Sequence, residues 1–157
     1  MAKRFPTLAP NNFNKKTLGP TTGKRWLLKK IAFTNGVFDI LHEGHIASLS
    51  EAASYGDILI VAVNADASVK RLKGPSRPVN NEQSRALILA SLVITDAVII
   101  FEEDTPLHLI QTLLPDVLVK GGDYTIDQIA GAKEVLANGG EVKLARIIEG
   151  ISTTGII

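Results

Sequence analysis

The chain has 157 residues, a length suited to one domain, and 45% of them are hydrophobic whereas only 5% are aromatic, a balance typical of α/β proteins. It contains no cysteine, which excludes disulfides and zinc thiolates. No apolar run reaches the ~18 residues of a membrane helix, and the N-terminus lacks the apolar core of a secretory signal. We therefore expect a cytoplasmic protein.

Charge is unevenly distributed along the chain. The net charge is +1, but residues 1–30 carry eight Lys/Arg and no acid, which leaves nine Lys/Arg against sixteen Asp/Glu in the other 127 residues. This contrast divides the chain into a basic arm, 1–30, and a main domain, 31–157. Because the basic residues occur singly or in pairs, we expect the arm to lie on the acidic domain or on a partner subunit; binding to nucleic acid or to an anionic membrane is the alternative.

Short apolar segments alternate with amphipathic ones from residue 31 onward. Runs typical of strands buried on both faces occupy residues 31–34, 58–64, 97–101, 116–120 and 141–145. Helical patterns occupy residues 45–56, 81–92, 105–114 and 125–140. Thr105 followed by Pro106 predicts an N-cap with proline in the first helical turn. The alternation predicts an α/β fold, a Rossmann-like doubly wound parallel sheet of about five strands with helices on both faces.

In such sheets, ligands bind at the carboxyl ends of the strands, near a topological switch point. The stretch TNGVFDILHEGH follows the first strand and holds two of the three histidines, His42 and His45. They could ligate a metal, but a catalytic zinc needs a third protein ligand, and no GxSxG elbow or cysteine supports a nucleophile. Structural histidines are the simplest alternative. Gly44 favours phosphate, because a glycine at a helix start lets an anion approach the free N–H groups there.

A basic segment follows the second strand. Between Lys70 and Arg85 the chain carries five Lys/Arg against one acid, and the glycine and prolines of residues 73–80 predict a mobile loop that brings cations to phosphates. Lys70 and Arg71 could equally be solvated surface residues. Asp66, just upstream, could hydrogen-bond sugar hydroxyls or cap the following turn.

Two small-residue segments follow the last two strands. Gly121 and Gly122 would let the chain pass close to a base or ribose, with Asp123 placed for a hydroxyl or for magnesium; a simple glycine turn is the alternative. Ser152 and the two threonines after it would combine N-cap hydroxyls with helix-start amides into a second anion site.

Taken together, the segments NGVFDILHEGH, GDILIVAVNADASVKRLKGPSRPV, LVKGGDY and EGISTT resemble the HxGH nucleotidyltransferase superfamily, and within it the adenylyltransferases that act on D-glycero-β-D-manno-heptose 1-phosphate for lipopolysaccharide or capsule synthesis. The resemblance runs from about Ile31 to the C-terminus. It implies transfer of AMP from ATP to the sugar phosphate, with Mg²⁺ bound to the triphosphate, in a homodimer that needs neither nucleic acid nor membrane. Many such domains are fused to a sugar kinase, and we expect this chain to be the stand-alone form.

The resemblance also assigns roles to residues, with no metal ligand among them. It implies that His42, His45 and Lys73 are catalytic. It implies substrate contacts for Asn64, Asp66, Arg77 and Arg85. It implies nucleotide contacts for Thr34, Asn35, Gly36, Val37, Phe38, Gly44, Lys120, Gly121, Gly122, Asp123, Gly150, Ser152, Thr153 and Thr154.

The sequence departs from the family pattern at Val37, where relatives often have cysteine, and at Arg146, which lies one residue further from Gly150 than the arginine of the glycerol-phosphate enzymes. An alternative function is kept, a cytidylyltransferase for glycerol 3-phosphate or a similar alcohol phosphate with CTP in place of ATP, although VKGGDY and the arginine spacing lean against it. A nucleic-acid-binding protein with an idle nucleotide site is the more distant alternative.

Overall fold

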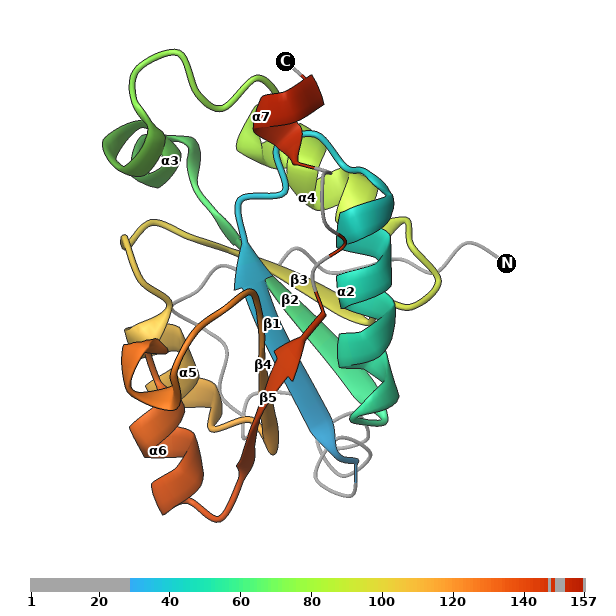
Figure 1. Cartoon of the computed structure of the whole chain (residues 1–157), viewed down its shortest axis with the longest axis vertical. Helices are drawn as coiled ribbons and strands as arrows, with labels where there is room; N and C mark the ends of the chain where they lie inside the picture. The colour runs from blue at the N-terminus through green and yellow to red at the C-terminus, as the bar shows by residue number, and fades with distance from the viewer. Residues whose placement is uncertain (1–28, 147, 149–151, 157) are drawn as a thin grey trace, which may run out of the picture.

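The computed structural model describes residues 29–146, 148 and 152–156, and its sheet has five parallel strands in the order β3-β2-β1-β4-β5 (Figure 1). The strands are β1 Ile31–Gly36, β2 Ile58–Asn64, β3 Ala97–Phe101, β4 Val117–Gly121 and β5 Glu141–Ala145. All five lie where the apolar runs predict them, to within two residues at each end. After β3 the chain returns to the other side of β1, so the topological switch point lies between β1 and β4.

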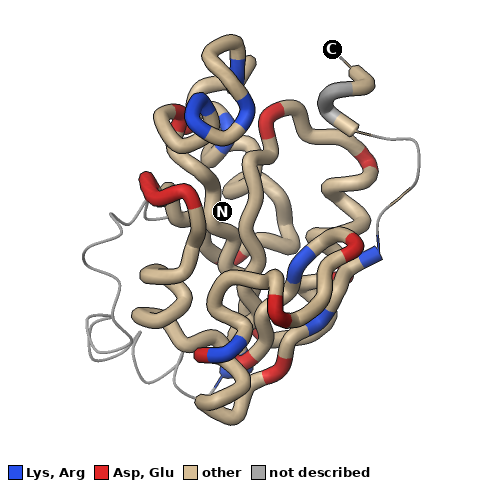
Figure 2. Tube along the Cα trace, turned by 60° about the vertical axis from the view of Figure 1, so that its left-hand side comes forward, with Lys and Arg blue, Asp and Glu red and all other residues tan. Residues whose placement is uncertain are grey.

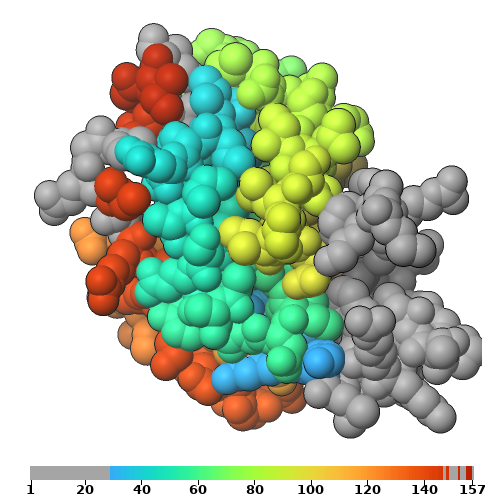
Figure 3. Space-filling model, turned by 90° about the vertical axis from the view of Figure 1, so that its right-hand side faces the viewer, coloured from blue at the N-terminus to red at the C-terminus, as the bar shows by residue number. Residues whose placement is uncertain are grey.

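Helices cover both faces of the sheet, as predicted. One face carries α2 Glu43–Ser54 and α4 Glu82–Ala90, which lie side by side in Figure 3. The other carries α5 Leu107–Leu113 and α6 Ala132–Ala137 (Figure 1). The remaining elements are α3 Asp66–Lys73, the 3₁₀ turn η2 Ile126–Gln128 and α7 Thr153–Ile156.

Successive side chains of β1 point to opposite faces of the sheet and so belong to two separate hydrophobic cores. Ile31 and Phe33 are buried in the core with α5 and α6, whereas Ala32 is buried in the core with α2 and α4. β2 is buried along its whole length, as expected of a strand covered on both faces. The edge strand β5 differs from this expectation, because Glu141 and Leu144 on it are exposed.

Three helix predictions need correction. Residues 66–73 form α3, a short and strongly charged helix that none of the predicted helical segments includes. The N-cap position of α5 is Pro106 rather than Thr105, and no side-chain hydrogen bond caps that helix. Residues 125–140 form η2 and α6 instead of one helix, since Gly131 takes a positive φ of 84° between them.

Gly131 provides a stability test of this break. A Cβ there would lie 2.6 Å from Cγ2 of the buried Ile110, whereas Gly139, with a similar φ of 80°, has nothing within 4 Å. We expect Gly131→Ala to lower the free energy of unfolding by about 1–3 kcal/mol more than Gly139→Ala, because only the first adds overlap to backbone strain. Urea unfolding of the two variants measures this difference, and equal losses would contradict it.

Candidate active site

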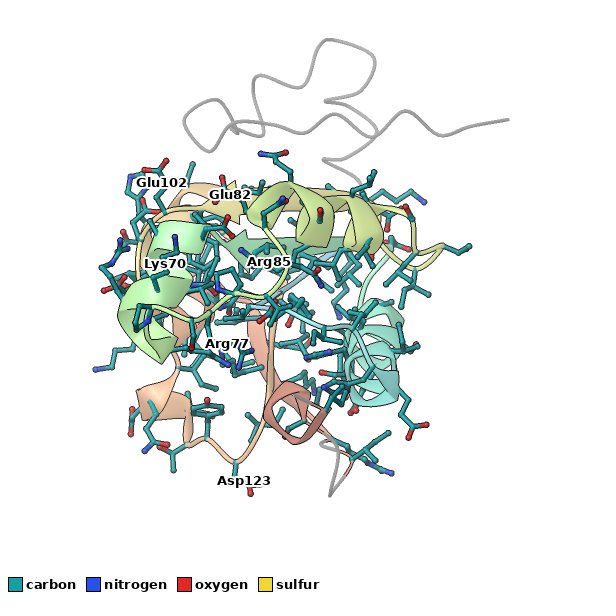
Figure 4. All side chains as sticks on the ribbon, turned by 90° about the horizontal axis from the view of Figure 1, so that it is seen from above. Lys70, Arg77, Glu82, Arg85, Glu102 and Asp123 are labelled. Carbon is teal, nitrogen blue, oxygen red and sulfur yellow. The ribbon has the colours of Figure 1, made fainter. Side chains whose placement is uncertain are left out.

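The carboxyl ends of β1, β2 and β4 meet at one edge of the sheet, which Figure 4 shows from above. His42 and His45 lie there at the start of α2, where His42 is the N-cap residue and its carbonyl accepts the N–H of His45 at 3.0 Å. Their rings stack with centroids 3.8 Å apart and planes inclined by 25°. Both side chains are half-buried, and neither Nδ1 has a hydrogen-bond partner in the described part of the chain.

Two glycines shape this histidine pair. A Cβ on Gly44 would lie 3.0 Å from the His42 ring, so glycine makes room for that ring over the helix start. A Cβ on Gly36 would lie 3.0 Å from the ring of Phe38, which in turn meets His45 edge-on at a centroid distance of 5.3 Å. The glycines therefore position the histidines, in addition to the close anion approach expected of Gly44.

The electrostatics of this pair favour an anion. Burial, with the positive charges of His42 and Lys73 adding to it, lowers the pKa of His45 from 6.5 to about 4, although a backbone hydrogen bond with Ile40 acts the other way. His45 is thus a neutral imidazole at neutral pH. Three groups able to carry positive charge face one another here, and a phosphate between them would relieve their repulsion.

Asp39 and Arg77 join the exit of β1 to the loop of residues 74–81. The Asp39 carboxylate is almost fully buried and accepts hydrogen bonds from Arg77 Nε at 2.8 Å and from the N–H groups of Val79 and Asn80 at 2.9 Å. Burial alone would raise the pKa of Asp39, but the bonds from Asn80, Val79 and Arg77 outweigh it and hold that pKa below 3.8. Arg77 Nη2 is buried without a partner among the described residues, which leaves it to bind a ligand.

Arg85 has a different position from the one expected. Its guanidinium is fully buried and donates to the Val37 carbonyl at 2.7 Å, the Asn80 carbonyl at 2.9 Å and Asp66 Oδ1 at 2.7 Å. These bonds occupy Nε, Nη1 and Nη2, so Arg85 ties the site loops together and does not reach a substrate in this arrangement. Asp66 is correspondingly paired with Arg85 and caps no turn.

Two further predicted binding residues are buried in the fold. Thr34 is 5% exposed inside β1, and Asn64 is 4% exposed at the end of β2. The Asn64 amide donates to the Ser68 hydroxyl, which donates to the Glu103 carbonyl, both at 3.0 Å. The Asn64 and Ser68 side chains therefore connect β2, α3 and the loop after β3.

The basic residues at 70, 71 and 73 lie in the last turn of α3, so the loop predicted at 73–80 begins one residue later, after Lys73. Figure 2 shows them as a concentration of positive charge at one end of the molecule. Arg71 is paired with Asp104 at 2.7 Å, half-exposed, and so is a surface residue, as one alternative held. Lys73 is the one whose charge acts on His45.

The last residues of β4 face opposite sides of the sheet. A Cβ on Gly121 would lie 3.1 Å from Ser48 Oγ of α2, whereas Lys120 lines a pocket of about 180 Å³ on the face of α5 and α6. Gly122 takes a φ of 124°, which the turn requires. Asp123 is exposed and points outward at the rim in Figure 4.

Asn35 was the only other lining residue of this pocket that the sequence predicted to bind a ligand. The remaining ones were not predicted to do so: Asp104, Thr105, Pro106, Tyr124, Gln128, Ile129 and Ala130. The sequence did contain a sign that the Gln128 side chain is held in place. TIDQ is a capping box, in which Thr125 and Gln128 form reciprocal hydrogen bonds at the helix start.

The C-terminal segment is described in part. Gly150 lies outside the described residues, and Thr153 and Thr154 open α7, at the end of the molecule to which the strands point (Figure 1). Ser152 Oγ accepts the N–H of Gly155 at 3.1 Å, as expected of a hydroxyl at a helix start. Over the described ranges, no helix is long and apolar enough to cross a membrane, and no three His, Cys, Asp or Glu side chains are grouped to hold a metal ion.

Comparison with known proteins decides the family. Residues 33–157 match the cytidylyltransferase-like family. The chain belongs to the cytidylyltransferase-like family. The expected superfamily and fold are thereby confirmed, and this match runs from within β1 to the end of α7.

The relatives of this cytidylyltransferase-like chain include much longer proteins. It is 59% identical over 129 residues to the Bifunctional protein HldE of Haemophilus influenzae, and 57% identical to that of Cronobacter sakazakii. Each match covers 82% of this chain and 27% of the relative, so the chain spans about a quarter of the length of these proteins.

Solved structures agree on the fold. A lipopolysaccharide core biosynthesis protein from Thermoplasma volcanium has a TM-score of 0.61 and 32% identity, covering 76% of this chain and 97% of that one. A pantoate-beta-alanine ligase from Francisella tularensis, 17% identical with a TM-score of 0.58 over 91% of this chain and 67% of its own, shares the fold alone.

Asp39→Asn tests the buried carboxylate. We expect the free energy of unfolding at neutral pH to fall by about 2 kcal/mol, because a charged acceptor of three hydrogen bonds is lost. Because the pKa of Asp39 in the folded protein lies below 3.8, the full difference in stability between the wild type and the variant is expected above that pH. The difference disappears as the pH falls through the folded pKa of Asp39. Urea unfolding at neutral pH and at about pH 3 measures it, with the exposed Asp127→Asn as control. A loss of equal size at both pH values would refute the assignment.

His45 makes a second pH prediction. Its ring should stay neutral from alkaline pH down to about pH 5, because burial and neighbouring cations lower its pKa to about 4. NMR titration of the histidine ring protons, assigned with His45→Gln, follows the protonation directly. Added pyrophosphate should raise that midpoint, since a bound anion offsets the cations. A midpoint near the ordinary 6.5 without ligand is incompatible with this environment.

Proposed function

We propose that the chain transfers AMP from ATP to D-glycero-β-D-manno-heptose 1-phosphate and releases ADP-heptose and pyrophosphate. The observation that carries this proposal is a cluster of polar atoms at the end of β1 that have no partner among the described residues: Nδ1 of His42, Nδ1 of His45 and Nη2 of Arg77, with Lys73 near them. The relatives named HldE and the lipopolysaccharide core biosynthesis protein support the sugar nucleotide as the product class.

The chemistry proposed for this cluster is positioning and charge stabilisation. An oxygen of the sugar's phosphate attacks the α-phosphorus in line, a new P–O bond forms, and the bond to pyrophosphate breaks. A phosphate monoester with a second pKa of about 6 is largely ionised at neutral pH, so no general base is needed. His42 and His45 would donate hydrogen bonds to phosphate oxygens, and Lys73 and Arg77 would add positive charge where pyrophosphate leaves.

Mg²⁺ would enter with the triphosphate. The carboxylates nearest these donors are already committed, Asp39 to Arg77 and Asp66 to Arg85, so the described residues provide no metal site of their own. When bound, the ion offsets charge on the phosphates, and the protein's share of the work stays with its cationic side chains.

Several expectations from the sequence remain proposals. We propose a homodimer in the cytoplasm, with the basic arm 1–30 against the acidic domain 31–157 or a partner subunit. The arm lies almost wholly outside the described residues. The matched region makes up only 27% of the bifunctional relatives, which fits the expectation that this kind of domain is often fused to a second enzyme.

Release of pyrophosphate tests the reaction. ATP or CTP, with Mg²⁺ and either heptose 1-phosphate or glycerol 3-phosphate, makes four pairs, and we expect turnover with ATP and heptose 1-phosphate. Turnover confined to CTP and glycerol 3-phosphate would establish the alternative cytidylyltransferase. If no pair releases pyrophosphate, both the adenylyltransferase and the cytidylyltransferase proposals are wrong.

The histidines have a matched control within the chain. We expect His42→Ala and His45→Ala to lower kcat about 100-fold or more while the KM for ATP changes little, because their hydrogen bonds strengthen as charge develops. His108→Ala removes an exposed histidine on α5 and should leave kcat unchanged. Steady-state kinetics of the three variants gives the comparison, and an unchanged kcat in the first two would remove their assigned role.

A further inference from the structure

The pocket on the face of α5 and α6 lies across the sheet from the histidines. Asn35 and Lys120 line it, and along their strands they alternate with Gly36 and Gly121, which face the α2 side. Phe33 and Leu118, two residues earlier, belong to the core with α5 and α6. The ends of β1 and β4 therefore present a cationic site on one face and this pocket on the other.

The lining of the pocket offers open hydrogen-bond donors beside an aromatic face. Lys120 Nζ lies 5.5 Å from the centroid of the Tyr124 ring and has no ion pair or hydrogen bond within the described residues. Burial lowers the pKa of Lys120. The Gln128 side-chain oxygen accepts the Thr125 N–H, which commits its acceptor but not its amide donors.

The charge in the pocket is nearly balanced. Its one carboxylate, Asp104, is paired with Arg71 at 2.7 Å. An ammonium, amide donors and an aromatic ring suit a neutral ligand with many hydroxyls, whose oxygens accept hydrogen bonds and whose C–H surface packs on a ring. A triphosphate fits the opposite face better, where histidines, Lys73 and Arg77 gather.

In-line transfer links the two faces. The attacking and leaving oxygens must lie on opposite sides of the α-phosphorus. If pyrophosphate leaves toward the histidines, the acceptor must approach the α-phosphorus from the opposite face of the sheet. The pocket lined by Lys120 lies on that face. This step rests on the proposed function.

We propose that the pocket binds the hydroxyl-bearing ring of the acceptor sugar phosphate, with Lys120 and Tyr124 as specificity-determining residues. This moves Lys120 from the nucleotide, its expected ligand, to the acceptor. Gly121 and Gly122 keep the nucleotide assignment, since Gly121 faces α2.

Binding of each ligand separately tests this assignment. Heptose 1-phosphate and a non-hydrolysable ATP analogue are titrated calorimetrically into the wild type, Lys120→Met, Tyr124→Ala and Tyr124→Phe. We expect the Kd for the sugar phosphate to rise about tenfold in Lys120→Met and Tyr124→Ala but less than about twofold in Tyr124→Phe, which keeps the ring. The Kd for the nucleotide should stay within about twofold throughout.

The chain offers a matched control for the lysine. Lys143 Nζ lies 5.8 Å from the ring of Tyr55, nearly the geometry of the Lys120 pair, but away from the pocket. Lys143→Met should bind both ligands as the wild type does.

Three results would overturn the inference: weaker nucleotide binding in the pocket variants, unchanged sugar phosphate binding in them, or no sugar phosphate binding by the wild type. Wild-type sugar phosphate binding without pyrophosphate release would refute the proposed function alone.

Discussion

The buried Asp39 carboxylate is the interaction on which the site depends. Asp39 follows β1 closely in sequence, and its oxygens accept from Arg77, Val79 and Asn80, about forty residues later. A charge with so little exposure is stable only when its lone pairs are satisfied, so the loop of residues 74–81 has to lie against the exit of β1. Arg77 reaches the strand ends as a consequence.

Arg85 holds the same segments together with a buried positive charge, where Asp39 uses a buried negative one. Its buried guanidinium binds Val37, Asn80 and Asp66, which belong to the β1 exit, the loop and the start of α3. With both ion pairs satisfied internally, the buried atoms that lack a partner at this site, among the described residues, are Nδ1 of His42, Nδ1 of His45 and Nη2 of Arg77. The paired charges are thus buried, and polar atoms without a partner remain where an anion can bind.

Much of the fold could be predicted from the sequence. The five strands are buried apolar runs whose β-branched residues have no plausible helical alternative at that length, and all five predictions hold. The helix α3 was missed because it has only eight residues, four of them charged, a composition that resembles a solvated loop. The division of residues 125–140 was missed because nothing local shows that the Gly131 turn must pass close to Ile110.

The sequence by itself determined the chemistry that the site can offer: histidines around Gly44, a basic segment after the second strand and glycines after the fourth. These are residue types and spacings, which need no knowledge of contacts. The tertiary structure alone decided which cations are free. Arg85 and Arg77 look alike in the sequence, yet one is consumed by Asp66 and two carbonyls while the other keeps an open Nη2. Burial and pairing depend on residues distant in the chain, and so does the separation of Lys120 from Gly121 onto opposite faces of the sheet.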